Sequence, residues 1–223
     1  HPLVREAIRE AAAKGLPVLT LVSDIGNVPS VGYVGIDNRA AGRLAGHLLG
    51  RFMPRGPGEV ALFAGSLSYR GHEEREMGFR HMLAEDYPDL RIVELREVRD
   101  DLLRSYREAR VLLEARPARG GIYNIGAGNR GIARALEETG RARRVVFIGH
   151  ELTEHTRRFL LAGTMDAVID QNPRVEAWEA VDRLLRAARG DPELGAVPVR
   201  ISATIPVCRS MTPPGCRPRP TSQ

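Results

Sequence analysis

Three glycines in the stretch IYNIGAGNRGIARA have the spacing of a nucleotide-binding loop. Gly126, Gly128 and Gly131 form the pattern G-x-G-x-x-G between a strand-like run and a helix-like run. Glu151 follows about twenty residues later, where a dinucleotide site places the acid that binds the ribose hydroxyls. However, Asn and Arg separate the last two glycines, where a pyrophosphate loop usually has small apolar residues. An NAD-dependent oxidoreductase using residues 126–131 is therefore an alternative and not the favoured function.

A second set of polar residues follows apolar runs, at positions expected of strand ends. Asp37, Asn124, Glu151 and Gln171 each come at or just after such a run, and Arg75 lies on the helix-like segment after GSLSY. Ligands of open parallel sheets bind beyond the carboxyl ends of the strands. Carboxylates, amides and a guanidinium group can together donate to and accept from neighbouring hydroxyls. The set therefore predicts a site for a sugar or polyol.

Each of these residues also has a structural interpretation. Asp37 and Glu151 could cap the helices that follow them, and Asn124 could satisfy the backbone of a turn. Arg75 could pair with a neighbouring glutamate on its own helix. Gln171 favours binding, because a helix cap would be a smaller side chain. Convergence on one cleft is what favours binding for the set as a whole.

Further polar residues are expected to line the same cleft: Asp24, Ser68, Tyr69, His72 and His150. Nothing in the sequence favours catalysis, because Ser68 and His72 belong to no recognisable triad pattern and no GxSxG motif is present. The clusters His72-Glu73-Glu74 and His150-Glu151 lack the spacing of metal ligands. We therefore expect a binding protein, with no enzyme activity, no metal and no cofactor.

Apolar runs typical of strands alternate with helical patterns along almost the whole chain. The strand-like runs are 17–22, 31–36, 59–64, 90–95, 120–125, 144–149, 165–170 and 199–205. The helical patterns are 3–14, 38–53, 72–86, 101–116, 129–140, 153–162 and 174–190. This alternation predicts an α/β fold in which helices cover parallel sheets. Eight strands exceed what one small sheet comfortably holds, so two lobes are expected.

Composition narrows the range of partners. The 223 residues carry a net charge of +5, but aromatic residues make up only 5%, which favours a solvated basic surface over a nucleic-acid groove. No apolar run approaches the roughly 18 residues of a membrane helix. Cys208 and Cys216 lie in a Pro/Arg-rich tail after residue 205 and cannot form a disulfide framework.

The order of motifs resembles the effector-binding domain of the lac repressor family. The matching segments are YVGIDNRAAGRLAGHLL (33–49), EVALFAGSLSYRGHEEREMGFRHML (59–83), GIYNIGAGNRGIARAL (121–136), VVFIGHEL (145–152) and DAVIDQNPRVEAWEAVDRLL (166–185). The resemblance covers roughly residues 1–205. It implies a two-lobed fold like that of periplasmic sugar-binding proteins, of type I, with the opening part of the first lobe missing. The first lobe would comprise 1–55 and 171–192, and the second 56–170 and 193–223.

The resemblance also implies a function and a set of contacts. The family's effector contacts fall on Asp37, Arg75, Asn124, Glu151 and Gln171. A sugar or related effector would bind between the lobes of a cytoplasmic homodimer and shift its affinity for operator DNA. DNA binding would need an N-terminal helix-turn-helix that this sequence lacks, and no membrane contact is implied. A periplasmic sugar-binding protein of a transporter is the other interpretation within the binding class.

Overall fold

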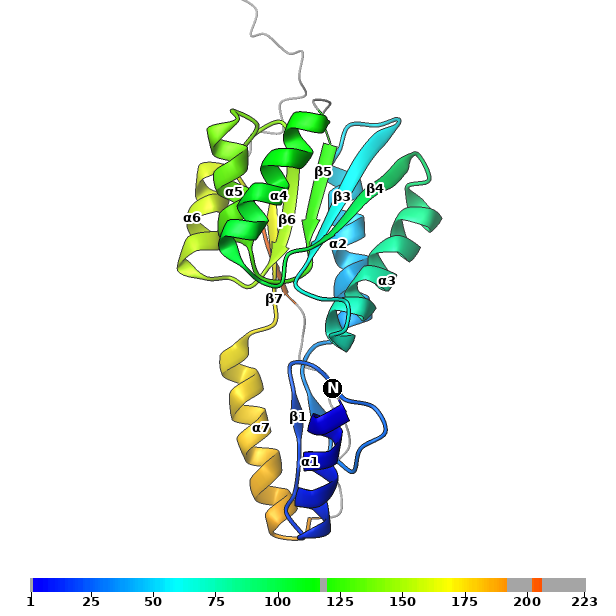
Figure 1. The fold of residues 1–223 in the computed structure, drawn as a ribbon, viewed down its shortest axis with the longest axis vertical. Coiled ribbons are helices and arrows are strands. Elements are labelled where there is room, and N and C mark those ends of the chain that lie inside the picture. The colour runs from blue at the N-terminus through cyan, green and yellow to red at the C-terminus, as the bar shows by residue number, and fades with distance from the viewer. Residues whose placement is uncertain (1, 117–119, 192–201, 206–223) are drawn as a thin grey trace, which may run out of the picture.

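The computed structural model describes residues 2–116, 120–191 and 202–205. Their larger sheet has six strands in the order β4–β3–β5–β6–β7–β8 and is shown in the upper part of Figure 1. Its strands are β3 (Gly58–Ala64), β4 (Leu90–Glu97), β5 (Gly120–Asn124), β6 (Val146–His150), β7 (Ala167–Asp170) and β8 (Ser202–Thr204). Strands β3 to β7 pair in parallel, so their carboxyl ends lie along one edge of the sheet.

Helices cover both faces of this sheet. One face holds α2 (Asn38–Phe52) and α3 (Arg70–Asp86), and the other holds α4 (Leu102–Ala115), α5 (Asn129–Glu138) and α6 (Glu154–Ala162). Leu62 and Tyr123 point into the first core, and Phe63 and Phe147 into the second. Strands buried on both faces must be apolar at nearly every position, which explains the continuous runs in the sequence. The predicted α/β class, with parallel strands between helices, is confirmed.

A smaller part of the molecule lies below the six-stranded sheet in Figure 1. It contains α1 (Pro2–Ala13), the parallel pair β1 (Thr20–Leu21) and β2 (Tyr33–Val34), and α7 (Pro173–Ala188), which contacts both strands. Between the two parts the chain passes through residues 35–37 and 171–172. Two of the residues predicted from strand ends, Asp37 and Gln171, lie on these two connections.

Strand β8 departs from the expected parallel arrangement, because it pairs antiparallel to β7. The chain leaves the sheet at Asp170, passes through α7, and returns at the same edge, where Ser202 pairs with Asp170. A strand that re-enters at the carboxyl edge of its neighbour must run in the opposite direction. Of the predicted run 199–205, residues 199–201 lie outside the described residues, as do the end of the second lobe after 205 and both cysteines.

Helix α2 lies on the six-stranded sheet, although the predicted division places residues 38–52 in the first lobe. Ala41, Ala45 and Leu49 are buried in the same core as Leu62 and Tyr123. The amphipathic pattern of this helix matches the apolar face of the larger sheet, so α2 lies with the predicted second lobe. The rest of the division stays a prediction.

Candidate ligand pocket

A pocket of about 490 Å³ opens at the carboxyl edge of the six-stranded sheet. It lies beside the loops that follow β3, β4, β5 and β6, and the segment after β1 closes one side. Its lining residues are Val22, Ser23, Tyr69, Gly71, His72, Arg75, Asp100, Gly126, Ala127, Gly128, Asn129, Arg130, His150, Glu151, Thr153, His155, Thr156 and Gln171. Three of the five predicted contacts are therefore in one pocket, namely Arg75, Glu151 and Gln171.

Arg75 is the fixed cation of the pocket. Its side chain is only 5% exposed. Its Nε donates to Asn38 Oδ1 at 2.7 Å, and its Nη1 donates to the carbonyl oxygen of Ile125 at 3.0 Å. Its Nη2 donates to Gln171 Oε1 at 3.2 Å. These contacts use three of the five guanidinium N–H groups. They hold the guanidinium plane in one orientation, so a ligand need not order it on binding.

Gln171 and Glu151 extend this network across the pocket. Gln171 accepts from Arg75 and donates through Nε2 to the Glu151 carboxylate. Burial raises the pKa of Glu151 above its ordinary value, and the positive charge of Arg75 opposes that shift. Glu151 has the left-handed φ of 69°, and its backbone N–H donates to the carbonyl of Ile169 at 2.9 Å. Its carboxylate is thereby directed at the pocket and does not cap α6.

The cap of α6 is Thr153, whose side chain accepts from the backbone N–H of Thr156. The alternative role of Glu151, capping the helix that follows it, is therefore filled by Thr153. For Asp37 the opposite holds, because it is exposed and its Oδ1 accepts from the backbone N–H of Ala40 at 2.9 Å. Asp37 is the N-cap of α2 and does not line the pocket.

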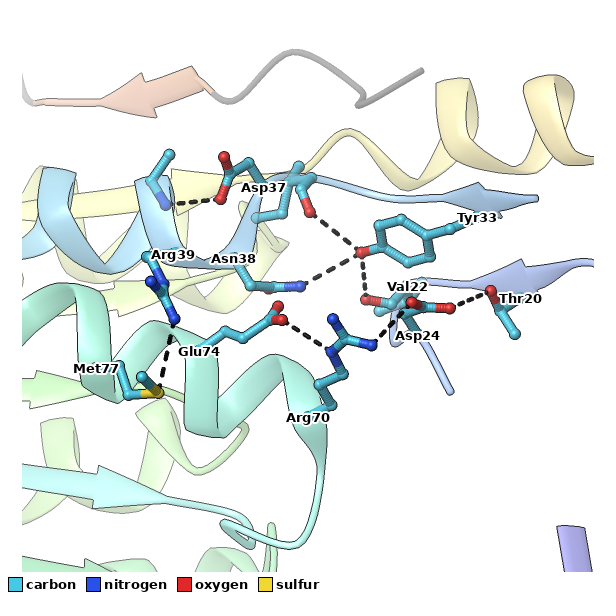
Figure 2. Close-up of polar contacts among 12 residues, drawn as sticks. Thr20, Val22, Asp24, Tyr33, Asp37, Asn38, Arg39, Arg70, Glu74 and Met77 are labelled. Carbon is cyan, nitrogen blue, oxygen red and sulfur yellow. Dashed lines mark hydrogen bonds and ion pairs between the residues drawn. The ribbon is translucent and has the colours of Figure 1, made fainter. Parts of the chain in front are cut away.

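Asn38, the residue after Asp37, contacts Arg75 but does not itself line the pocket. It is buried, and besides accepting from Arg75 it donates through Nδ2 to the Tyr33 hydroxyl at 3.3 Å. Figure 2 shows that hydroxyl also reaching the carbonyl oxygens of Val22 and Ile36. The connection between β2 and α2 is therefore tied both to Arg75 and to the segment after β1.

Asn124 is fully buried and holds the glycine turn instead of facing the pocket. Its Nδ2 donates to the carbonyls of Gly126 and Ala127, at 2.9 and 3.2 Å. It also donates to Asn129 Oδ1 at 2.7 Å. Asn129 lines the pocket and in turn donates to the carbonyl of His150 at 2.8 Å. The sequence predicted Asn124 as the amide in the pocket, whereas the structure places Asn129 there.

The G-x-G-x-x-G motif is explained by packing within the chain. A Cβ on Gly126 would lie 2.7 Å from Asp100 Oδ1 and 2.9 Å from His72 Cε1. Gly128 has a φ of 106°, which L side chains rarely adopt. A Cβ on Gly131 would lie 2.7 Å from the backbone nitrogen of Tyr106 on α4. Each glycine is required by its surroundings without a bound pyrophosphate.

The remaining predicted lining residues divide into two groups. Tyr69, His72 and His150 line the pocket, whereas Asp24 and Ser68 do not. Asp24 accepts a hydrogen bond from the Thr20 hydroxyl and forms an ion pair with Arg70 at 3.1 Å. Arg70 also forms an ion pair with Glu74 (Figure 2). Burial, followed by the charge of Arg75, lowers the pKa of His72. Among the residues described, no group of three or more His, Cys, Asp or Glu side chains could hold a metal ion.

Glu176 is a buried acid beside the pocket that the sequence did not reveal. It lies in the first turn of α7, where an exposed acid is ordinary because of the helix dipole. Here it is only 1% exposed, and neither carboxylate oxygen has a hydrogen-bond partner among the described residues. Burial, followed by the negative charge of Glu151, raises its pKa to about 7.

Replacing Glu176 with glutamine is expected to change how stability depends on pH. Because folding raises this pKa from 4.5, the carboxyl contributes stability below about pH 4.5 that is lost as pH rises through about 7. Glu176→Gln stays neutral, so its melting temperature should exceed that of the wild type by roughly 5 °C more at pH 8 than at pH 5. Melting curves at both pH values measure this difference.

Glu154→Gln is the matched control, since it removes an exposed first-turn carboxylate from α6. Its melting temperature should follow that of the wild type at both pH values. An identical pH dependence in wild type and Glu176→Gln would contradict the raised pKa.

Comparison with known proteins identifies the family. The periplasmic binding protein domain matches residues 1–192. The chain belongs to this family. Among solved structures, it is similar to GanP, a glucose-galactose binding protein from Geobacillus stearothermophilus, with 26% identity and a TM-score of 0.83. That match covers 90% of this chain and 71% of GanP.

Two further structures are similar to the same extent. One is an ABC transporter solute binding protein from Burkholderia graminis in complex with D-arabinose (26% identity, TM-score 0.86, covering 91% of this chain and 71% of that one). The other is the periplasmic component of an ABC-type sugar transport system from Hahella chejuensis (26% identity, TM-score 0.84, covering 89% and 72%). No curated protein sequence matches the chain.

These findings bear on the expectations from sequence. The periplasmic-binding-protein-like fold is confirmed, and the family and its sugar-binding neighbours indicate a binding protein rather than an enzyme. The dehydrogenase alternative based on residues 126–131 is therefore not supported. Within the described ranges, no helix is long and apolar enough to cross a membrane.

Proposed function

We propose that this chain binds a small sugar in the pocket beside Arg75, as a sugar-binding protein of an ABC-type transporter. The main observation behind this proposal is the buried guanidinium of Arg75, which is fixed by hydrogen bonds to Asn38, Ile125 and Gln171. The Glu151 carboxylate lies at the other end of this network. Fixed donors beside a fixed acceptor suit hydroxyl groups, which both donate and accept hydrogen bonds. The sugar-binding neighbours support the same ligand class.

The proposed contacts are Arg75, Glu151 and Gln171, with His72, His150 and Tyr69 in the pocket wall. Asn124 and Asp37 act indirectly, by holding the glycine turn and by capping α2. The ligand would favour the arrangement in which the smaller part of the molecule closes on the pocket, a shift between existing conformations. Under this proposal the protein acts outside the cytoplasm, in place of the cytoplasmic location expected from the sequence.

The effector-binding domain of a lac-repressor-type regulator is the second candidate. It rests on the five ordered sequence motifs, whereas the similar structures are transporter components. Homodimer formation and operator binding belong to this candidate and remain predictions. The gene sequence upstream of residue 1 distinguishes the two, because a secretory signal favours the transporter and a helix-turn-helix favours the regulator.

A thermal-shift screen tests the proposal. A ligand at 100 times its Kd should stabilise the fold by about 2.7 kcal/mol, or roughly 5–10 °C in melting temperature. We expect this from at least one of D-arabinose, D-galactose and D-glucose, and no shift from NAD(H). A shift with NAD(H) and none with any sugar would contradict the proposal and restore the nucleotide-binding interpretation of the glycine motif.

A further inference from the structure

His150 is a buried pocket residue with one ring nitrogen paired and the other unpaired. It ends β6, its side chain is only 1% exposed, and it contributes to the pocket wall. Its Nε2 lies 2.8 Å from the Tyr123 hydroxyl oxygen. Its Nδ1 is buried and has no hydrogen-bond partner among the described residues. A buried polar atom without a partner is uncommon in a folded protein and asks for an explanation.

The Tyr123 ring is held in the core, with its hydroxyl within hydrogen-bonding distance of His150. The ring is fully buried in the core between the sheet and α3, where it stacks on Phe79 with ring centres 4.7 Å apart. Among the described residues, the hydrogen-bond partner of its hydroxyl is His150 Nε2. Burial raises the pKa of Tyr123, so the hydroxyl keeps its proton at neutral pH. It therefore has one proton to donate.

The tautomer of His150 follows from how many buried donors and acceptors each form leaves without a hydrogen bond. Burial, and then the charges of Arg75 and His72, hold the pKa of His150 well below its ordinary value, so the ring is neutral and carries one N–H. With the proton on Nε2, both the tyrosine O–H and the Nδ1 lone pair would stay unpaired. With the proton on Nδ1, the tyrosine donates to Nε2 and only the Nδ1–H remains. The second arrangement leaves fewer buried groups unsatisfied, so it is favoured.

We propose that Tyr123 fixes His150 as its Nδ1–H tautomer, and that this N–H donates a hydrogen bond to an acceptor oxygen of the bound sugar. The inference rests on the proposed sugar-binding function and adds a donor to it. His150 would lie between two groups already assigned, because Glu151 follows it in sequence and Arg75 shares the pocket. The site then offers acceptor oxygens two fixed donors, the Arg75 guanidinium and the His150 ring. Because the ring is held by Tyr123, its N–H points in one direction, whereas a lysine or serine side chain could rotate its donor.

The tautomer can be measured without any ligand. Long-range nitrogen–carbon NMR correlations of the imidazole ring in the full chain should show a protonated Nδ1 and a bare Nε2 on His150 between pH 5.5 and 8. Tyr123→Phe removes the donor to Nε2, so its His150 should show a larger share of the Nε2–H form. A wild-type ring protonated at Nε2 would overturn the proposal.

The contact with the ligand is measured by titration calorimetry with D-arabinose, or with the sugar that gives the largest thermal shift. His150→Leu should weaken binding about 10- to 100-fold, because the ligand loses a buried donor. His150→Asn keeps an N–H near the Nδ1 position and should stay within about threefold of the wild type. Tyr123→Phe/His150→Leu removes both partners together, so it tests the same loss without an unpaired tyrosine hydroxyl.

His81→Leu is the control, since His81 is exposed on α3 away from the pocket lining, and it should bind as the wild type does. Wild-type affinity in both leucine variants at position 150 would overturn this inference and leave the sugar-binding proposal intact. If no sugar binds to the wild type, the sugar-binding proposal itself fails, and the NMR spectrum still decides the tautomer.

Discussion

Gly42→Ala is expected to destabilise the protein by about 3 kcal/mol, or roughly 5–10 °C in melting temperature, and to abolish sugar binding. Gly42 lies on α2 where this helix crosses α3. A Cβ there would press on the backbone carbonyl of Arg75, with 2.8 Å to its carbonyl carbon and 2.9 Å to its Cα. Backbone cannot rotate away as a side chain can, so the helices must separate. Arg75 would then move out of its network.

Gly50→Ala on the same helix is the matched comparison. Its Cβ would meet the ring of Tyr87, 2.5 Å from Cδ1, which is a partly exposed side chain that can turn aside. Alanine also favours a helix over glycine by about 1 kcal/mol. Gly50→Ala should therefore keep its stability within about 1 kcal/mol of the wild type. Calorimetric unfolding measures both variants, and similar losses from both would contradict the role assigned to the contact between α2 and α3.

Arg75→Ala is expected to weaken sugar binding at least 100-fold. The substitution removes a fixed, buried donor from the pocket and leaves its three acceptors on Asn38, Ile125 and Gln171 without that donor. Truncating one member of a buried charged hydrogen-bond network costs about 2–5 kcal/mol, and 100-fold in affinity is about 2.7 kcal/mol. Arg75→Met keeps more of the side-chain volume and should fold better while losing the same affinity.

Arg80→Ala provides the control for both variants. Arg80 lies on α3 as Arg75 does, but it is 46% exposed and pairs on the surface with Glu76. Its removal should leave sugar affinity unchanged and stability within about 0.5 kcal/mol. Calorimetric titration of the three variants compares them directly. Wild-type affinity in Arg75→Met would show that the guanidinium does not contact the ligand.

The order of helices and strands could be predicted from the sequence, because strands buried on both faces must be apolar throughout. The runs 59–64 and 120–125 correspond within a residue to β3 and β5. The direction of β8 could not be predicted in this way, because it depends on where the chain re-enters the sheet. The helical pattern 3–14 corresponds within a residue to α1, although that helix has no buried residue among those described.

The region of the pocket could be predicted, but not every side chain in it. The rule that ligands bind at the carboxyl edge of parallel strands correctly brought Arg75, Glu151 and Gln171 together. It failed at Asp37 and Asn124, because each satisfies nearby backbone groups and neither lines the pocket. Side-chain direction at a strand end is set by the local turn, which periodicity does not report.

Glu176 shows a different limit of sequence reasoning. An acid in the first turn of a helix is stabilised by the helix dipole at any exposed site, so its type and position gave no signal. Glu176 is buried where α7 begins after the connection at 171–172, and it interacts electrostatically with Glu151 and Arg75. Only the three-dimensional arrangement of this connection reveals it.

A crystal structure of the chain with D-arabinose, or with the sugar that stabilises it most, tests the central claim most directly. The account predicts sugar density in the pocket, with hydroxyl or ring oxygens within about 3 Å of the Arg75 guanidinium and the Glu151 carboxylate. Sugar bound at another surface, with the network from Asn38 through Arg75 and Gln171 to Glu151 unchanged and the pocket holding only solvent, would contradict it.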